Sequence, residues 1–294
     1  MKLQTPVTDE KCKVGISYND KITMLGSCFS DNIGNQLSDF GFDVCVNPFG
    51  TLYNPVSILR SVERLIGGKH FTEEDCVQIG AGDMRFCSYS HHTSFARATI
   101  KEFLTDANHA LEEASEFFRT CNKIIITLGT SWCYRNIERD MIVSNCLKHP
   151  AAEYKREFLS ASQTADILTE IMNLCNGSEG SVTPKEFIFT VCPIRHLKDG
   201  AHGNQISKAS ILVGVNQVLN NTTSCKTDYF PSYEIVMDEL RDYRFYAEDM
   251  CHPTLQTENY ICKRFLGWAL PACEHTVLEE KIKSYKRQSH ISFQ

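Results

Sequence analysis

One stretch of the sequence indicates the fold class of this chain: Lys123-Ile124-Ile125-Ile126-Thr127-Leu128-Gly129. It is almost continuously apolar and ends at a glycine, which is typical of a strand covered by other elements on both faces. Immediately before it, apolar side chains recur at helical spacing from Phe103 to Phe118, which predicts a long helix. A strand buried on both faces and a helix that leads into it indicate an α/β protein with a parallel sheet.

Strand and helix patterns alternate outward from this run. We expect further strands at residues 22–26, 42–46 and 186–192, and helices at residues 29–40, 56–66, 164–175, 205–219 and 255–270. This alternation predicts a three-layer α/β/α sandwich around a mostly parallel central sheet. No repeat or linker interrupts it, so we expect a single domain over residues 1–294 with a helical tail from about residue 275.

Two polar stretches, residues 71–99 and 132–155, depart from this regular pattern. They carry His91, His92 and His149. Loops that carry polar side chains often surround the functional site of an α/β protein, so we expect both stretches to be insertions at the rim of the sheet.

The composition is that of a folded globular protein, with 42% hydrophobic and 22% charged residues among 294. There are 30 basic and 36 acidic residues, which give a formal net charge of −6, and no run of Lys or Arg. A phosphate backbone or an anionic membrane attracts clustered basic residues. We therefore expect neither nucleic acid nor membrane as a partner.

The 14 cysteines form no Cys-x-x-Cys pair, and several stand in apolar runs, as Cys192 does after Phe189-Thr190-Val191. Cysteine in such a run behaves as a small apolar residue, so we expect most of the thiols to be reduced and buried. Residues 1–10 lack the apolar core of a signal peptide, and no stretch of 18 apolar residues occurs. The sequence thus predicts a soluble cytoplasmic protein.

Histidines and carboxylates occur in residues 91–92 and 196–202, but their spacing matches no known metal-binding motif. We therefore expect no metal and no cofactor.

Ligands of an open α/β sheet bind beyond the carboxyl ends of its strands. Four segments occupy such positions: Gly26-Ser27-Cys28-Phe29-Ser30, Asn47-Pro48-Phe49-Gly50-Thr51, Gly129-Thr130-Ser131-Trp132, and Glu248-Asp249-Met250-Cys251-His252-Pro253-Thr254. In the last segment the carboxylate of Asp249 can orient the imidazole of His252 as a general base within one turn. In the first, a hydroxyl or thiol stands at a helix N-terminus, which predicts a lowered thiol pKa and free N–H donors for an oxyanion.

The first segment differs by one residue from the Gly-Ser-Cys-Phe-Ala signature of the GSCFA-domain proteins, which belong to the SGNH/GDSL-like hydrolases. The resemblance extends from about Ile22 to Leu270 and is carried by the order of the four segments. It implies an SGNH-hydrolase-like, flavodoxin-like fold. In that superfamily the segments supply a nucleophilic serine, a glycine, an asparagine and an Asp-x-x-His pair.

The resemblance implies roles for individual residues. The nucleophile is Cys28 by alignment and Ser27 by chemical similarity to a serine hydrolase, and we favour Cys28. Asp249 and His252 complete the triad. Gly50 and the Thr130-Ser131 pair would contribute to the oxyanion hole, with Ser131 in the place of the asparagine. Three residues that follow strands would shape an acyl or alcohol pocket: Trp132, Arg195 and His196.

These expectations lead to an acyl-ester hydrolase that works through a covalent acyl-enzyme on a small-molecule or carbohydrate ester. Two alternatives stay open. The acyl group could pass to a sugar or another hydroxyl, which would make the protein an acyltransferase. Alternatively, the loss of the asparagine could mark a catalytically decayed carbohydrate- or ligand-binding module. The sequence does not indicate the oligomeric state.

Overall fold

The computed structural model describes residues 5–7, 11–177, 183–222 and 224–291, with the side chains of residues 289–291 not described. The segment over which we looked for a signal peptide, residues 1–10, lies mostly outside this part of the chain. Within the described residues, no helix is both long and apolar enough to cross a membrane.

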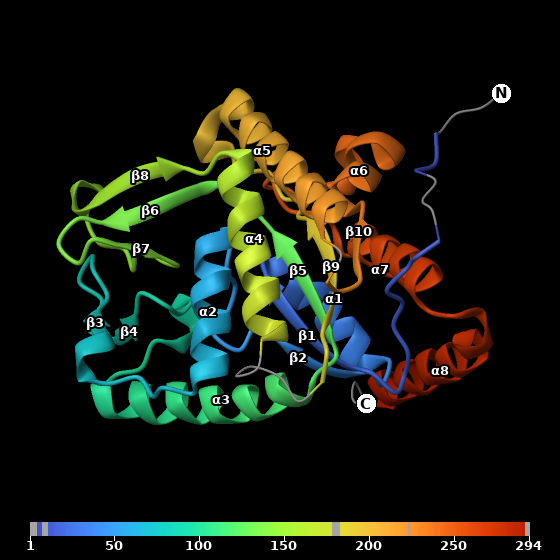
Figure 1. Ribbon diagram of the computed structural model, residues 1–294, viewed down its shortest axis with the longest axis horizontal. Helices are drawn as coiled ribbons and strands as arrows, with labels where there is room; N and C mark the ends of the chain where they lie inside the picture. Colours follow the sequence, from blue (N-terminus) through green and yellow to red (C-terminus); the bar gives the residue numbers. More distant parts are fainter. Residues whose placement is uncertain (1–4, 8–10, 178–182, 223, 292–294) are drawn as a thin grey trace.

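In the part of the chain that the structure describes, the central sheet has five strands, all parallel. They are β1 (Lys21–Gly26), β2 (Asp43–Val46), β5 (Lys123–Leu128), β9 (Glu186–Val191) and β10 (Thr227–Phe230). Their spatial order is β10-β9-β5-β1-β2, which is the order 2-1-3-4-5 when these five strands are numbered along the chain (Figure 1). This is the flavodoxin-like order, in which the topological switch point lies between the first and third strands, here β1 and β5.

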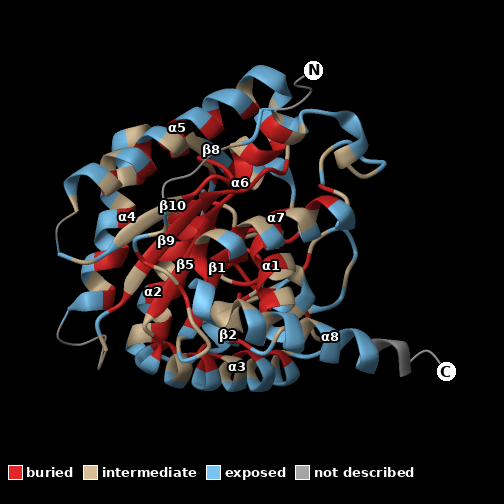
Figure 2. Ribbon diagram, turned by 90° about the vertical axis from the view of Figure 1, so that its right-hand side faces the viewer, coloured by how far each residue is buried: buried red, intermediate tan, exposed pale blue. Residues whose placement is uncertain are grey.

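Helices cover both faces of the sheet and complete a three-layer sandwich, as predicted. One face packs against α1 (Cys28–Asp39) and α7 (Leu255–Ala269). The other packs against α2 (Pro55–Gly67), α3 (Ile100–Thr120), α4 (Ala161–Asn176) and α5 (Gly200–Asn221). Figure 2 shows the buried strands between these layers.

The apolar run of β5 explains why two layers form. Ile124 and Ile126 point into the core on the α3 side, and Ile125 points into the core on the α1 side. Each of the three is at most 2% exposed. Burying one isoleucine side chain stabilises a fold by about 1.5–3 kcal/mol, so both faces of this strand contribute.

The polar stretches 71–99 and 132–155 form two small antiparallel sheets rather than irregular loops. β3 (Cys76–Gln78) pairs with β4 (Phe86–Ser88), and β6 (Trp132–Asn136) lies between β7 (Met141–Val143) and β8 (Tyr154–Phe158). Figure 1 shows both sheets on the side of the molecule away from α7 and α8.

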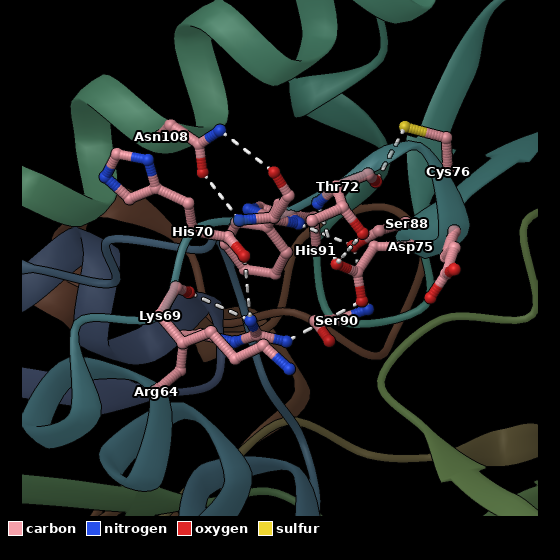
Figure 3. A network of polar contacts seen from close by, with 12 residues as sticks. Arg64, Lys69, His70, Thr72, Asp75, Cys76, Ser88, Ser90, His91 and Asn108 are labelled. Atoms are coloured by element: carbon pink, nitrogen blue, oxygen red, sulfur yellow. Dashed lines mark hydrogen bonds and ion pairs between the residues drawn. The ribbon is translucent and has the colours of Figure 1, made fainter.

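His91 anchors the first of these stretches to the core. Its side chain is fully buried, and its Nδ1 lies 2.7 Å from Ser88 Oγ. Four phenylalanine rings surround the imidazole, with centroids 4.6–5.4 Å away. Polar contacts nearby join α2 and α3 to the same stretch (Figure 3). Arg64 of α2 forms an ion pair with Asp75 at 3.6 Å, and the side chain of Asn108 in α3 bonds to the backbone N–H and carbonyl of Phe71.

Three elements lie outside the predicted pattern or at its end. The edge strand β10 was not predicted, and after it the short helix α6 (Ser232–Glu234) continues as a π-helix over Ile235–Leu240. The helical tail is present as α8 (His275–Ile291), which begins at the predicted position.

Candidate active site

Gly26, the last residue of β1, allows the sharp turn into α1. Its φ is +138°, and a Cβ at this position would lie 2.1 Å from the carbonyl oxygen of Thr127. Only glycine fits both requirements. The side chain of Asn47, at the end of β2, secures the turn, because its Oδ1 accepts the N–H of Gly26 at 2.8 Å.

The two candidate nucleophiles, Ser27 and Cys28, differ in solvent exposure. Ser27 is 1% exposed, and its Oγ has no hydrogen-bond partner among the described residues. Cys28, the first residue of α1, is partly exposed. Access to solvent therefore distinguishes Cys28 from Ser27.

The thiol of Cys28 is not activated by its position. Its pKa is raised to about 12, first by burial and then by the neighbouring Cys192, Asp31 and Glu258. The expectation of a lowered pKa at the helix N-terminus is wrong, because burial and nearby negative groups outweigh the helix dipole. At neutral pH the thiol is protonated and needs a base.

Asp249 and His252 form the pair that the sequence predicted. Asp249 Oδ2 lies 2.5 Å from His252 Nδ1, and Asp249 Oδ1 accepts the backbone N–H groups of Cys251 and His252 at 2.9 Å each. The hydrogen bonds from His252 and Cys251 lower the pKa of Asp249 to about 2. The carboxylate is therefore ionised, and with Nδ1 engaged, Nε2 of His252 is the nitrogen left to exchange protons. About half of each side chain is exposed.

Glu258 connects this pair to the thiol electrostatically. It stands in the first turn of α7, accepts a hydrogen bond from Asn32, and interacts with the charges of both Cys28 and His252. No hydrogen bond joins Cys28 to His252 among the described residues. In the described part of the chain, the thiol and the imidazole therefore both interact with Glu258 but not directly with each other.

The predicted oxyanion donors are engaged elsewhere. The N–H of Gly50 donates to the carbonyl of Asn47 at 2.7 Å. Both Thr130 and Ser131 bond to Ser207 of α5, and the N–H of Ser131 donates to the Ser207 hydroxyl at 2.8 Å. In the first turn of α1 the N–H of Ser30 donates to the carbonyl of Ser27 at 2.7 Å. The N–H groups of Cys28 and Phe29 have no backbone acceptor among the described residues, as is usual at a helix N-terminus.

Sequence reasoning missed Lys208, a buried cation under this edge of the sheet. Its ammonium donates to the carbonyls of Gly129 at 2.6 Å and Cys192 at 2.7 Å, and burial lowers its pKa to about 8. It thereby ties together the residues that follow β5 and β9. Its helical spacing from Ile211 and Val215 on the buried face of α5 was the available signal.

The three predicted pocket residues lie in different surroundings. The ring of His196 lies 6.1 Å from that of Tyr53, and burial together with Lys208 lowers the His196 pKa to about 4. Arg195 donates to the carbonyl of Met250, in the loop of the Asp249–His252 pair, at 3.4 Å. Trp132 packs instead on the β6–β8 sheet, with the Arg156 guanidinium 4.0 Å from its ring.

In the described part of the chain, no group of three His, Cys, Asp or Glu side chains is arranged to hold a metal ion.

The profile of the GSCFA family matches residues 21–265. This range begins with β1, ends within α7, and includes Cys28, Asp249 and His252. No protein of curated function and no solved structure matches the chain. Because the profile covers well over half of the sequence, the chain belongs to the GSCFA family.

Proposed function

We propose that this protein is an SGNH-like acyl-ester hydrolase with Cys28 as nucleophile, His252 as base and Asp249 as the group that orients it. The observation that carries the proposal is the Asp249–His252 pair, in which Asp249 Oδ2 lies 2.5 Å from His252 Nδ1. It is supported by Glu258, which interacts with the charges of both His252 and Cys28. A carboxylate that fixes Nδ1 of an imidazole and leaves Nε2 free is the arrangement that activates nucleophiles in acyl transfer.

In the first half-reaction, Nε2 of His252 takes the proton of Cys28 Sγ while the sulfur attacks the ester carbonyl carbon. This proton transfer is needed because the raised pKa of Cys28 leaves almost no thiolate at neutral pH. The carbonyl oxygen becomes an oxyanion, which the N–H groups of the first turn of α1 can stabilise. When the tetrahedral intermediate collapses, His252 gives its proton to the departing alcohol, and a thioester remains on Cys28.

In the second half-reaction, His252 takes a proton from water, and the hydroxide oxygen attacks the thioester carbonyl. Collapse returns the proton to the sulfur and releases the carboxylic acid. Asp249 stays ionised throughout and stabilises the imidazolium that forms in each half.

Acyl transfer to a hydroxyl other than water is the second candidate. It is favoured by the hydrogen bonds of Gly50 and Ser131, which leave few donors for an oxyanion. Removing one oxyanion donor slows hydrolysis by about 10²–10³-fold in other acyl-transfer enzymes. An alcohol bound next to the thioester would gain from its fixed position, which offsets part of this loss.

The test is turnover of short p-nitrophenyl esters by the full chain, with and without glycerol or glucose as acceptor. Release of nitrophenol and free acid supports the hydrolase. Nitrophenol release that rises with the added alcohol, with a new ester as product, supports the transferase. A binding module would be supported by two results together. The wild-type protein would release no nitrophenol above background, with or without added alcohol, and a ligand would raise the melting temperature of Cys28→Ala as it does that of the wild type.

A reducing compartment such as the cytoplasm is part of the proposal, because a thiol nucleophile functions only while it is reduced.

A further inference from the structure

A cavity of about 270 Å³ lies beside the loop that carries the Asp249–His252 pair. Its walls come from the segment after β9, the start of α5, the π-helix Ile235–Leu240 and the segment that follows it. The volume is near the lower end of the range for small-molecule sites, about 300–1,000 Å³. The cavity therefore suits a compact ligand.

Two residues connect the cavity to the candidate active site. Arg195 lines it and donates from its backbone and side chain to the carbonyls of Cys251 and Met250, at 3.2 and 3.4 Å. Tyr246 also lines it and is bridged to Pro253, the residue after His252. A ligand in this cavity would thus lie against the other side of the catalytic loop.

Two arginines line the cavity, Arg195 and Arg241, and the Arg195 guanidinium also lies 5.9 Å from the ring of Tyr246. Neither Arg195 nor Arg241 forms an ion pair with any carboxylate among the described residues. The one carboxylate in the lining, Asp242, is already paired with Arg244 at 2.8 Å and accepts the backbone N–H of Arg244 at 2.9 Å. The positive charge of the cavity is therefore not neutralised by the protein itself.

The rest of the lining is largely apolar or aromatic. It includes Val236, Met237, Tyr233 and Tyr246. The hydroxyl of Tyr233 donates a hydrogen bond to Gln205 Oε1 at 2.8 Å, so this tyrosine presents mainly its ring to the cavity. Such walls accept a flat or aliphatic body and leave the arginines to recognise a charged end.

The backbone that presents Arg241 is strained. Arg241 has a φ of +44°, and it directly follows the π-helix. A non-glycine residue in the left-handed region costs about 1–3 kcal/mol, and both strain of this kind and π-helical turns concentrate at functional sites. The strain is a second observation, independent of the charges, at the same wall of the cavity.

We propose that this cavity binds the anionic end, a carboxylate or a phosphate, of a compact ligand with an apolar body, through Arg195 and Arg241. Guanidinium groups match both anions in planar, two-point geometry. The inference goes beyond the proposed function, because the lining of the cavity includes none of Cys28, Asp249 and His252.

The experiment measures binding by isothermal titration calorimetry on the full chain, so that it does not depend on turnover. The probes are benzoate, its neutral counterpart benzamide, and phenyl phosphate. Variants are Arg195→Gln and Arg241→Gln. Arg119→Gln is the charge-matched control, because this residue is exposed and belongs to α3, which does not line the cavity. Thermal unfolding followed by circular dichroism verifies that each variant is folded.

We expect benzoate or phenyl phosphate to bind the wild-type protein, benzamide to bind at least about tenfold more weakly, and each cavity variant to lose about tenfold in affinity or more. Preference for one anion identifies it as the carboxylate or the phosphate. Equal binding of benzamide, or equal loss in Arg119→Gln, overturns the inference even if the protein is an esterase. Anion binding by a wild-type protein that shows no esterase activity refutes the proposed function and leaves the anion site standing.

Discussion

His91 and His252 both stand in polar stretches of the sequence, but the fold places them in opposite environments. His91 is fully buried among four phenylalanine rings, and burial lowers its pKa to about 3. The side chain of His252 is 53% exposed and bonded to an ionised Asp249. One imidazole is held neutral by its surroundings, whereas the other is oriented with a nitrogen free.

A titratable group can take part in proton transfer only where both of its protonation states are accessible. A histidine that cannot gain a proton inside the fold serves packing, and its hydrogen bond to Ser88 fixes the stretch that leads to His92 and Gly50. A histidine that keeps access to solvent and a carboxylate partner can cycle between its two protonation states. Loss of His252 should therefore affect turnover, and loss of His91 should affect stability.

The largest expected effect is on turnover in His252→Ala. Without the base, the protonated thiol of Cys28 has no route to the thiolate, so we expect the rate of p-nitrophenyl ester cleavage to fall by about 10³-fold or more. Its melting temperature should stay within about two degrees of wild type, because the side chain is exposed. His109→Ala, an exposed histidine on α3, is the matched control and should retain wild-type rates. Wild-type turnover in His252→Ala would exclude His252 as the base.

The next effect is a change in acid stability in His91→Leu. The folded-state pKa of about 3 lies below the ordinary value of about 6.5, so the unfolded chain binds a proton first as the pH falls. The contribution of neutral His91 to the unfolding free energy is thus fully present above pH 6.5. It is lost progressively as the pH falls to about 3. Between pH 7 and 4.5 the wild-type protein should lose about 2–3 kcal/mol more unfolding free energy than the variant.

Urea denaturation at the two pH values measures this difference, with His109→Ala as a histidine variant that should follow the wild type. Parallel pH dependence in His91→Leu and wild type would mean that His91 is not held neutral. Esterase activity of His91→Leu below its wild-type level at pH 7 would mean that the packing also supports the site.

The smallest effect concerns the charge around Cys28. We expect its alkylation by iodoacetamide, followed by peptide mass spectrometry, to accelerate about tenfold per pH unit from pH 7 to 10, because its pKa of about 12 leaves only a trace of thiolate. Asp31→Asn removes one of the negative neighbours, so alkylation at pH 8 should be about 3–10-fold faster. Asp39→Asn, at the other end of α1, should change it little. A plateau in the rate below pH 9 would contradict a raised pKa.

The sequence predicted the elements whose pattern is set by burial on both faces. The apolar run around Ile125 became β5, and the helices on either side of the sheet begin and end within a few residues of the predicted bounds, apart from an extra turn at the start of α5. The sequence did not predict β10, because Thr227–Phe230 is a short edge strand with few apolar residues. The strands from Trp132 to Phe158 escaped because their mixed polarity reflects a small sheet covered on one face only.

The site was predictable to the extent that it depends on position along the chain. Asp249 and His252 are three residues apart, so their pairing follows from local geometry. The raised pKa of Cys28 depends first on burial and then on Cys192, which is distant in sequence. The N–H of Gly50 is taken by Asn47 through a turn whose hydrogen bonding the sequence pattern did not reveal. Tertiary contacts, which no single-sequence pattern contains, decide these two properties.

The most direct test of the account is the intact mass of the protein after brief exposure to p-nitrophenyl acetate, with the adduct mapped by peptide digestion. We expect one acetyl group on the peptide that contains Ser27 and Cys28, labile to hydroxylamine, absent in Cys28→Ala and retained in Ser27→Ala. An acetyl group that persists on this peptide in Cys28→Ala, or turnover without any adduct on it under rapid quenching, would contradict a thiol acyl-enzyme at Cys28.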